Sequence, residues 1–106
     1  MPESTERGAL TEAVYYILLA LNTPMHGYGI MQFVKEISEG RVNLGPGTLY
    51  GAINTMLSKH WIEALPSETD SRKKEYKITE EGHKVVLDEM TRLRELLDSG
   101  IKILGV

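Results

Sequence analysis

The chain has 106 residues, of which 42% are hydrophobic and 25% charged, which excludes a fibrous or wholly disordered protein and predicts one domain with one core. It has no cysteine, which excludes disulfides, catalytic thiols and thiolate metal sites, and its longest apolar run, Ile17 to Leu21, is too short to span a membrane. We therefore expect a cytoplasmic protein. The net charge of −3 does not exclude a nucleic-acid partner, because residues 41–77 carry six basic and four acidic residues, a local charge of +2.

The first half of the chain predicts three helices after a frayed end at residues 1–8. Apolar residues recur at helical spacing over 10–21 and again over 26–39, where we expect His26 to cap the second helix. A third helix is predicted from Pro46 to about Lys59, because proline suits the first position of a helix.

The second half predicts a hairpin and a long final helix. The short segments 61–65 and 73–78 flank a turn, and Trp61 is expected to anchor the hairpin to the helices. Thr79 is predicted to cap a helix over 80–104, about 37 Å long. Its near-heptad apolar stripe is longer than the rest of the chain can cover, so we expect a homodimer through this helix. The stripe consists of Val86, Met90, Leu93, Leu97, Ile101 and Leu104.

The fold class is thus mainly α with a small β-hairpin. The expected architecture is a winged helix-turn-helix domain over 1–79 followed by a dimerisation helix over 80–106.

The outward face of the third helix is small and polar, where an ordinary surface helix would carry long charged side chains. Such a face suits the major groove of double-stranded DNA, and basic residues on the hairpin suit its phosphates. A solvated surface is the alternative for both sets. The predicted DNA contacts are Thr48, Gly51, Asn54 and Thr55 on the helix, and Arg72, Lys73, Lys74 and Lys77 on the hairpin.

Three strings in this order and spacing resemble the PadR family of transcription regulators: His26-Gly27-Tyr28-Gly29-Ile30, Gly47-Thr48-Leu49-Tyr50 and Lys74-Glu75-Tyr76-Lys77-Ile78-Thr79-Glu80-Glu81-Gly82. The resemblance implies a winged helix with the third helix as reader and the hairpin as wing. The same resemblance implies DNA contact by Thr48 and Tyr50, which match the family's string at the start of the reader helix. It also implies a homodimer of the short subfamily, whose members commonly repress transcription and often release DNA on binding a small molecule. The chain departs from the family at His60, where relatives often have glycine, and it has no aromatic residue after Tyr76 to stack a flat ligand.

A small-molecule effector, if one exists, is expected where the first helix meets the final helix of the mate, at Tyr15, Tyr16, Met90 and Leu93. We expect no cofactor and no metal, because the three histidines lie far apart in sequence. We expect no enzyme, because the carboxylate pairs Glu80-Glu81 and Asp88-Glu89 are predicted on exposed faces. The sequence therefore predicts a homodimeric regulator, most simply a repressor, on an inverted-repeat operator. The alternative is a protein-interaction module on a winged helix that no longer binds DNA.

Overall fold

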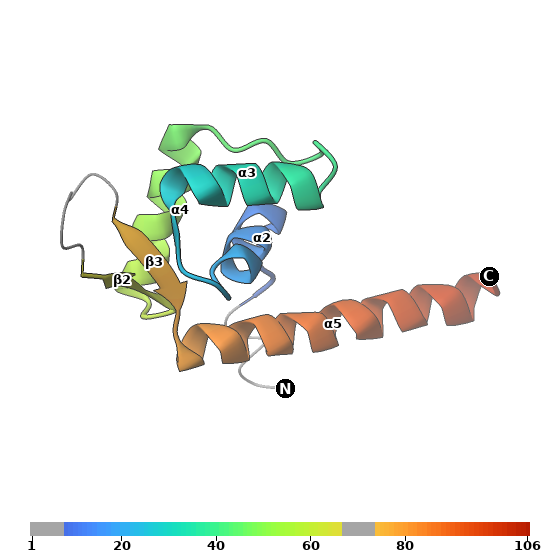
Figure 1. Cartoon of the computed structure of the whole chain (residues 1–106). Coiled ribbons are helices and arrows are strands. Elements are labelled where there is room, and N and C mark those ends of the chain that lie inside the picture. Colours follow the sequence, from blue (N-terminus) through green and yellow to red (C-terminus); the bar gives the residue numbers. More distant parts are fainter. Residues whose placement is uncertain (1–7, 67–73) are drawn as a thin grey trace.

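The computed structural model describes residues 8–66 and 74–106 and has the predicted order of two helices, a turn, a third helix, a hairpin and a long helix (Figure 1). The fold class, mainly α with a small sheet, is confirmed. The helices are α2 (Glu12–Ala20), α3 (Gly27–Ile37), α4 (Pro46–Ser58) and α5 (Glu80–Leu104), and the strands are β1 (Met25–His26), β2 (Ile62–Leu65) and β3 (Glu75–Ile78).

Side chains fix where three of the helices begin. The hydroxyl of Thr11 accepts from the N–H of Val14 at the start of α2. The prediction that His26 caps α3 is confirmed, because its Nδ1 accepts from the N–H of Gly29 at 3.3 Å. Thr79 caps α5 as predicted, accepting from the N–H of Gly82 at 3.0 Å. Each cap satisfies a donor that the first turn of a helix leaves unpaired.

The sheet has one strand more than the predicted hairpin. The strand order is β1-β3-β2, and both pairings are antiparallel. Strand β1 has only two residues, Met25 and His26, which pair with Tyr76 and Glu75. This short pairing ties the start of α3 to the hairpin.

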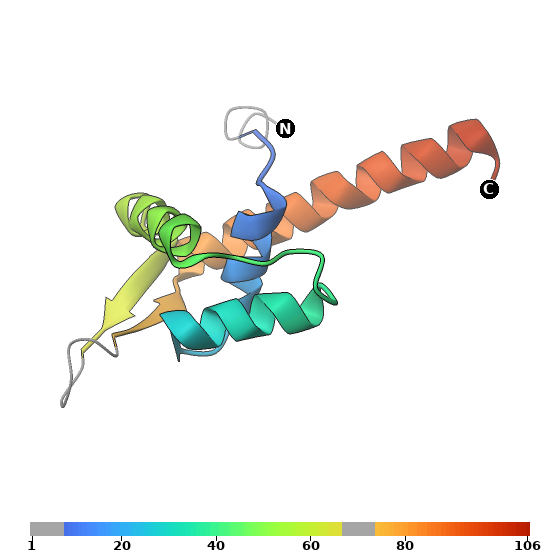
Figure 2. The same ribbon diagram turned by 90° about the horizontal axis from the view of Figure 1, so that it is seen from above.

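The core lies between α2, α3, α4 and the sheet, and Figure 2 shows how these elements surround it. The buried side chains of the three helices, together with Leu21 directly after α2, are Ile17, Leu18, Leu21, Ile30, Val34, Leu49, Ile53 and Met56. The first turns of α5 complete the core with Val85 and Val86.

The second half of α5 extends away from this body with no other element beside it, as both ribbon views show (Figures 1 and 2). The molecule is accordingly elongated, measuring 55 × 31 × 21 Å. None of the described helices combines the length and the apolar character that crossing a bilayer requires.

Candidate nucleic-acid interface

Helix α4 has one face in the core and one face open. Leu49, Ile53 and Met56 point inward and are buried. The opposite face is exposed over its whole length and is built from small residues without charge. It consists of Gly47, Thr48, Gly51, Asn54, Thr55 and Ser58. The structure therefore brings the predicted contacts of the third helix together on one open surface.

Among the residues that the structure describes, nothing packs against the two glycines of this face. A β-carbon at Gly47 or at Gly51 would meet no atom within 4 Å. Glycine within a helix costs about 0.5–1 kcal/mol relative to alanine, so Gly51 weakens α4 with no compensating contact among the described residues. The two glycines leave this part of the helix surface without side chains.

Tyr50 lies at the edge of this face, where α4 meets α3 and the wing. Its ring fits against Gly27, where a β-carbon would lie only 2.9 Å from the Tyr50 Cζ atom. Burial, and secondarily the nearby Tyr50, raise the pKa of Tyr76 on β3 above its ordinary value. Tyr50 remains 44% exposed, so it both packs at this junction and reaches the surface.

The start of α4 differs from the starts of the other helices. Its N-cap residue is Gly45, which has no side chain to bond the free N–H groups, and Pro46 follows at the first helical positions. The peptide N–H groups of this first turn therefore point outward without a side-chain partner.

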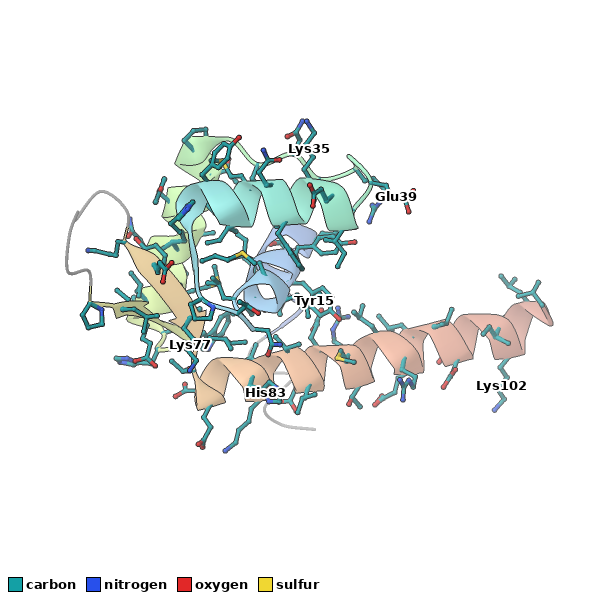
Figure 3. The ribbon with its side chains drawn as sticks, in the orientation of Figure 1. Tyr15, Lys35, Glu39, Lys77, His83 and Lys102 are labelled. Carbon is teal, nitrogen blue, oxygen red and sulfur yellow. The ribbon has the colours of Figure 1, made fainter. Side chains whose placement is uncertain are left out.

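Of the four basic residues that were predicted to contact DNA from the wing, two fall within the described residues. Lys74 and Lys77 are both exposed, and Figure 3 shows Lys77 on the hairpin strand β3. Lys77 lies directly opposite Glu63 in the antiparallel register, so part of its charge is offset. Arg72 and Lys73 lie outside the described residues.

Most of the predicted dimerisation stripe is exposed. Leu97 and Leu104 are 63% and 75% exposed, and Met90, Leu93 and Ile101 are 41% exposed. Val86 differs, because it is only 5% exposed and packs in the core of its own chain. Sequence reasoning also missed Leu96 and Ile103, which are exposed on the free half of α5 and fall at helical spacing beside the stripe.

The structure brings together three of the four residues predicted for an effector. Tyr15, Tyr16 and Leu93 line a pocket of about 310 Å³ between α2 and α5, and Figure 3 shows Tyr15 in this region. Met90 is not among the residues that line it. We expected α2 to pack on the final helix of the mate, whereas here it packs on α5 of its own chain.

Glu89 was predicted on an exposed face and is instead 2% exposed, so that prediction is wrong. Its carboxylate accepts two hydrogen bonds from Arg92, at 2.9 and 2.5 Å, and one from the N–H of Leu10 at 3.3 Å. These bonds offset the cost of burying the charge, and the bond from Leu10 ties the segment just before α2 to α5.

A family model described as the transcriptional regulator PadR-like family matches residues 17–88. The chain belongs to this family. It is therefore a transcriptional regulator and not an enzyme, and the winged helix that the sequence predicted is confirmed.

Solved structures of PadR regulators share the fold of this PadR-like chain. A PadR family transcription regulator from hypervirulent Clostridium difficile R20291 is 25% identical, with a TM-score of 0.70 over 90% of this chain and 100% of that one. One from Eggerthella lenta is 23% identical, with a TM-score of 0.68 over 86% of this chain and 76% of that one.

One relative of this chain is a much longer protein. It is an uncharacterised 37.1 kDa protein of a Streptomyces fradiae transposon, 33% identical over 76 residues, which are 71% of this chain and 21% of the relative. The chain thus spans about a fifth of that protein's length.

Proposed function

We propose that this PadR-like regulator is a homodimer that binds double-stranded DNA through α4 and represses transcription from an inverted-repeat operator. The observation that carries the proposal is the open face of α4, whose glycines are not needed by the fold. A flat face of small polar residues suits a helix that enters the major groove, where each base pair offers a distinct pattern of donors and acceptors.

Each part of the surface has a separate task in this proposal. Asn54 and Thr55 face base edges, and an asparagine side chain pairs well with adenine. The uncapped first turn of α4 offers N–H groups to a phosphate, with Thr48 and Tyr50 beside it. Lys74 and Lys77 on the wing, with Arg72 and Lys73, bind flanking phosphates and position the protein without reading sequence.

The dimer would form through the free half of α5. The same side of α5 that packs on the core through Val86 continues outward as exposed leucines and isoleucines. A second copy of the helix would cover this surface and would place two α4 helices on one DNA site. Residues 1–79 would then bind DNA and residues 80–106 would pair the chains, and the two half-sites would lie about one or two helical turns apart.

A small-molecule effector would act at the pocket lined by Tyr15, Tyr16 and Leu93. This pocket adjoins the Glu89 contact that fastens α2 to α5, so a ligand there would shift the angle between the DNA-binding body and the dimer helix.

The test is fluorescence anisotropy on fragments selected from genomic DNA, measured over a series of salt concentrations. The logarithm of the wild-type association constant should fall linearly with the logarithm of the salt concentration. The slope should be about −0.9 for each phosphate that the protein neutralises. Asn54→Ala should weaken the free energy of binding to the selected sequence by about 1–3 kcal/mol and should change binding to random DNA little. Lys74→Ala should weaken both equally and lower the slope by about one.

The matched control is Lys102→Ala, since Lys102 is a lysine that Figure 3 shows on the free half of α5, away from α4 and the wing. It should leave DNA affinity unchanged. Salt-independent or absent binding to every fragment would refute the proposal and favour the protein-interaction module.

A further inference from the structure

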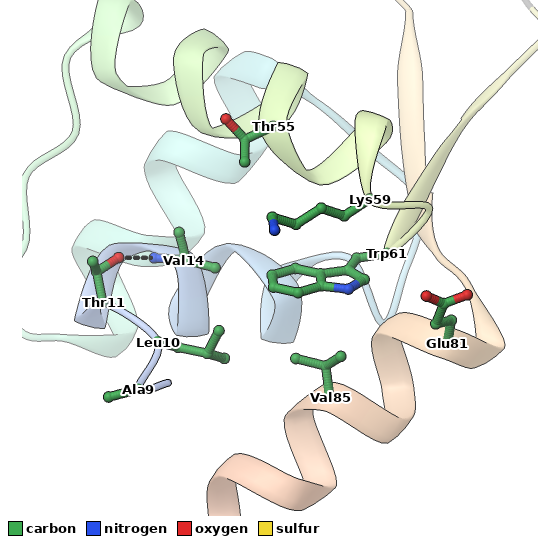
Figure 4. Close-up of a pocket in the computed structure, with 9 residues that line it drawn as sticks. All are labelled: Ala9, Leu10, Thr11, Val14, Thr55, Lys59, Trp61, Glu81 and Val85. Atoms are coloured by element: carbon green, nitrogen blue, oxygen red, sulfur yellow. Dashed lines mark hydrogen bonds between the residues drawn. The ribbon is translucent and has the colours of Figure 1, made fainter. Parts of the chain in front are cut away.

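A second pocket, of about 570 Å³, lies between the start of α2, the end of α4 and the first turns of α5 (Figure 4). Its apolar walls are Leu10, Val14 and Val85, and Trp61 forms one side. Lys59 and Glu81 supply opposite charges at its edge. It shares only Leu10 and Thr11 with the pocket at Tyr15 and Tyr16.

The exposed side of the Trp61 ring is already covered by a cation. The ammonium nitrogen of Lys59 lies 5.4 Å from the ring centroid, and Figure 4 shows the lysine chain passing over the indole. A positive charge is attracted to the electron-rich face of an indole. Aromatic rings stack with centroids about 4.5–7 Å apart, so anything that uses this face must first displace the ammonium.

The charges around the pocket decide what can displace Lys59. A neutral molecule would remove the contact between the cation and the ring without replacing it. An anion would be attracted to the Lys59 ammonium, but it would meet the negative Glu81 and would gain nothing from the electron-rich face of Trp61. A cation replaces the ammonium on Trp61, gains Glu81 as counter-ion and can bury an apolar body against Leu10, Val14 and Val85.

We propose that this pocket binds an organic cation with an apolar body, which takes the place of the Lys59 ammonium over Trp61 and is neutralised by Glu81. The site lies within one chain and shares Thr55 with the DNA surface proposed for α4. It adjoins α4 through Thr55 and Lys59, and β2 begins directly after Trp61.

Trp61 is the only tryptophan of the chain, so its fluorescence reports directly on the pocket. The full-length protein is titrated with hexyltrimethylammonium chloride, which is cationic and not aromatic, below the concentration at which it forms micelles. The expected result is a saturable change in emission, with an affinity at least about tenfold greater than for sodium heptanoate or 1-hexanol.

Three variants assign the roles, each checked for folding by circular dichroism. Lys59→Met removes the competing cation and should tighten binding of the probe. Glu81→Gln should weaken it about twofold to fivefold. Glu80→Gln is the matched control, because this neighbouring acid does not line the pocket, and it should bind like the wild type. Each of three results would overturn the proposal. The first is no saturable change in emission in either the wild type or Lys59→Met, and the second is equal affinity for the cationic probe and for sodium heptanoate. The third is equal affinity of Glu81→Gln and Glu80→Gln for the probe.

Discussion

The phenol oxygen of Tyr50 occupies the space that a β-carbon on Gly27 would take. Gly27 is the first residue of α3, and Tyr50 lies in the first half of α4. The Tyr50 ring therefore fills the space that the missing side chain at Gly27 leaves between the two helices. Because Tyr50 also borders the open face of α4, this packing contact helps to aim a residue of the proposed DNA surface.

Gly27→Ala should destabilise the protein by about 1 kcal/mol, because the added methyl group displaces the half-exposed Tyr50 ring from its position. In a Tyr50→Ala background the same change should cost much less, since the obstructing ring is gone. Urea unfolding followed by Trp61 fluorescence measures both arms of this double-mutant cycle. Equal costs in the two backgrounds would show that the collision is not the cause.

Gly51→Ala should separate stability from DNA binding. A β-carbon at Gly51 meets open space, so alanine should raise the free energy of unfolding by about 0.5–1 kcal/mol through its higher helix propensity. The same methyl group stands on the face proposed to approach DNA and should lower affinity there. Urea unfolding and DNA anisotropy on the same samples test this, and unchanged or tighter DNA binding would contradict the assigned role.

The parts of the fold that sequence predicted are those with a strong local signal. The helices have clear apolar periods, and His26 and Thr79 precede them as capping residues. Strand β1 was missed, because Met25 and His26 are too few to show an alternating pattern and pair only through contact with distant β3.

The part of the candidate site that lies on one helix face could be predicted from the sequence. The contacts between segments that are distant in the sequence could not. The open face of α4 follows from the spacing of its residues. Glu89 was misjudged, although its position between Val85 and Leu93 at helical spacing could have placed it on the buried side. Its partner Leu10 is 79 positions away, so no local pattern could have revealed their hydrogen bond.

His60→Gly should stabilise the protein. His60 follows the end of α4 with φ of +63°, in the left-handed region that favours glycine. The strain of a side chain there is about 1–2 kcal/mol, and the greater freedom of glycine in the unfolded chain offsets about 0.4–1 kcal/mol of it. A net gain of about 0.5–1 kcal/mol is expected in urea unfolding. Lys59→Gly, at φ of −89°, is the control and should bring no gain.

Tyr76 should make the protein less stable in strongly alkaline solution. Burial raises its pKa in the folded state above the ordinary value of 10.0, so the unfolded chain loses its phenolic proton first as the pH rises above about 10. The free energy of unfolding should be unaffected by this residue below about pH 9 and should then fall. The phenylalanine of Tyr76→Phe cannot ionise, so the free energy of unfolding of this variant should fall less steeply between about pH 9 and pH 10.5. Identical slopes for the two proteins in urea unfolding would show that Tyr76 makes no contribution.

Leu97→Asp should separate the dimer into monomers. Leu97 is 63% exposed on the free apolar side of α5, so the charge would be tolerated in a single chain but would be buried without a partner between two. Thr91→Asp is the matched control, because Thr91 is exposed on the opposite side of the same helix. Light scattering after size exclusion should give a halved mass for Leu97→Asp alone, and dissociation of both variants or of neither would argue against this face.

The central claim is that two chains pair along α5 and so present two α4 helices to one DNA site. Sedimentation equilibrium of the wild-type protein at micromolar concentration tests it most directly. The account predicts a single species of about 24 kDa, twice the 11.9 kDa of one chain. A species with the mass of one chain, unchanged as the concentration rises, would contradict it.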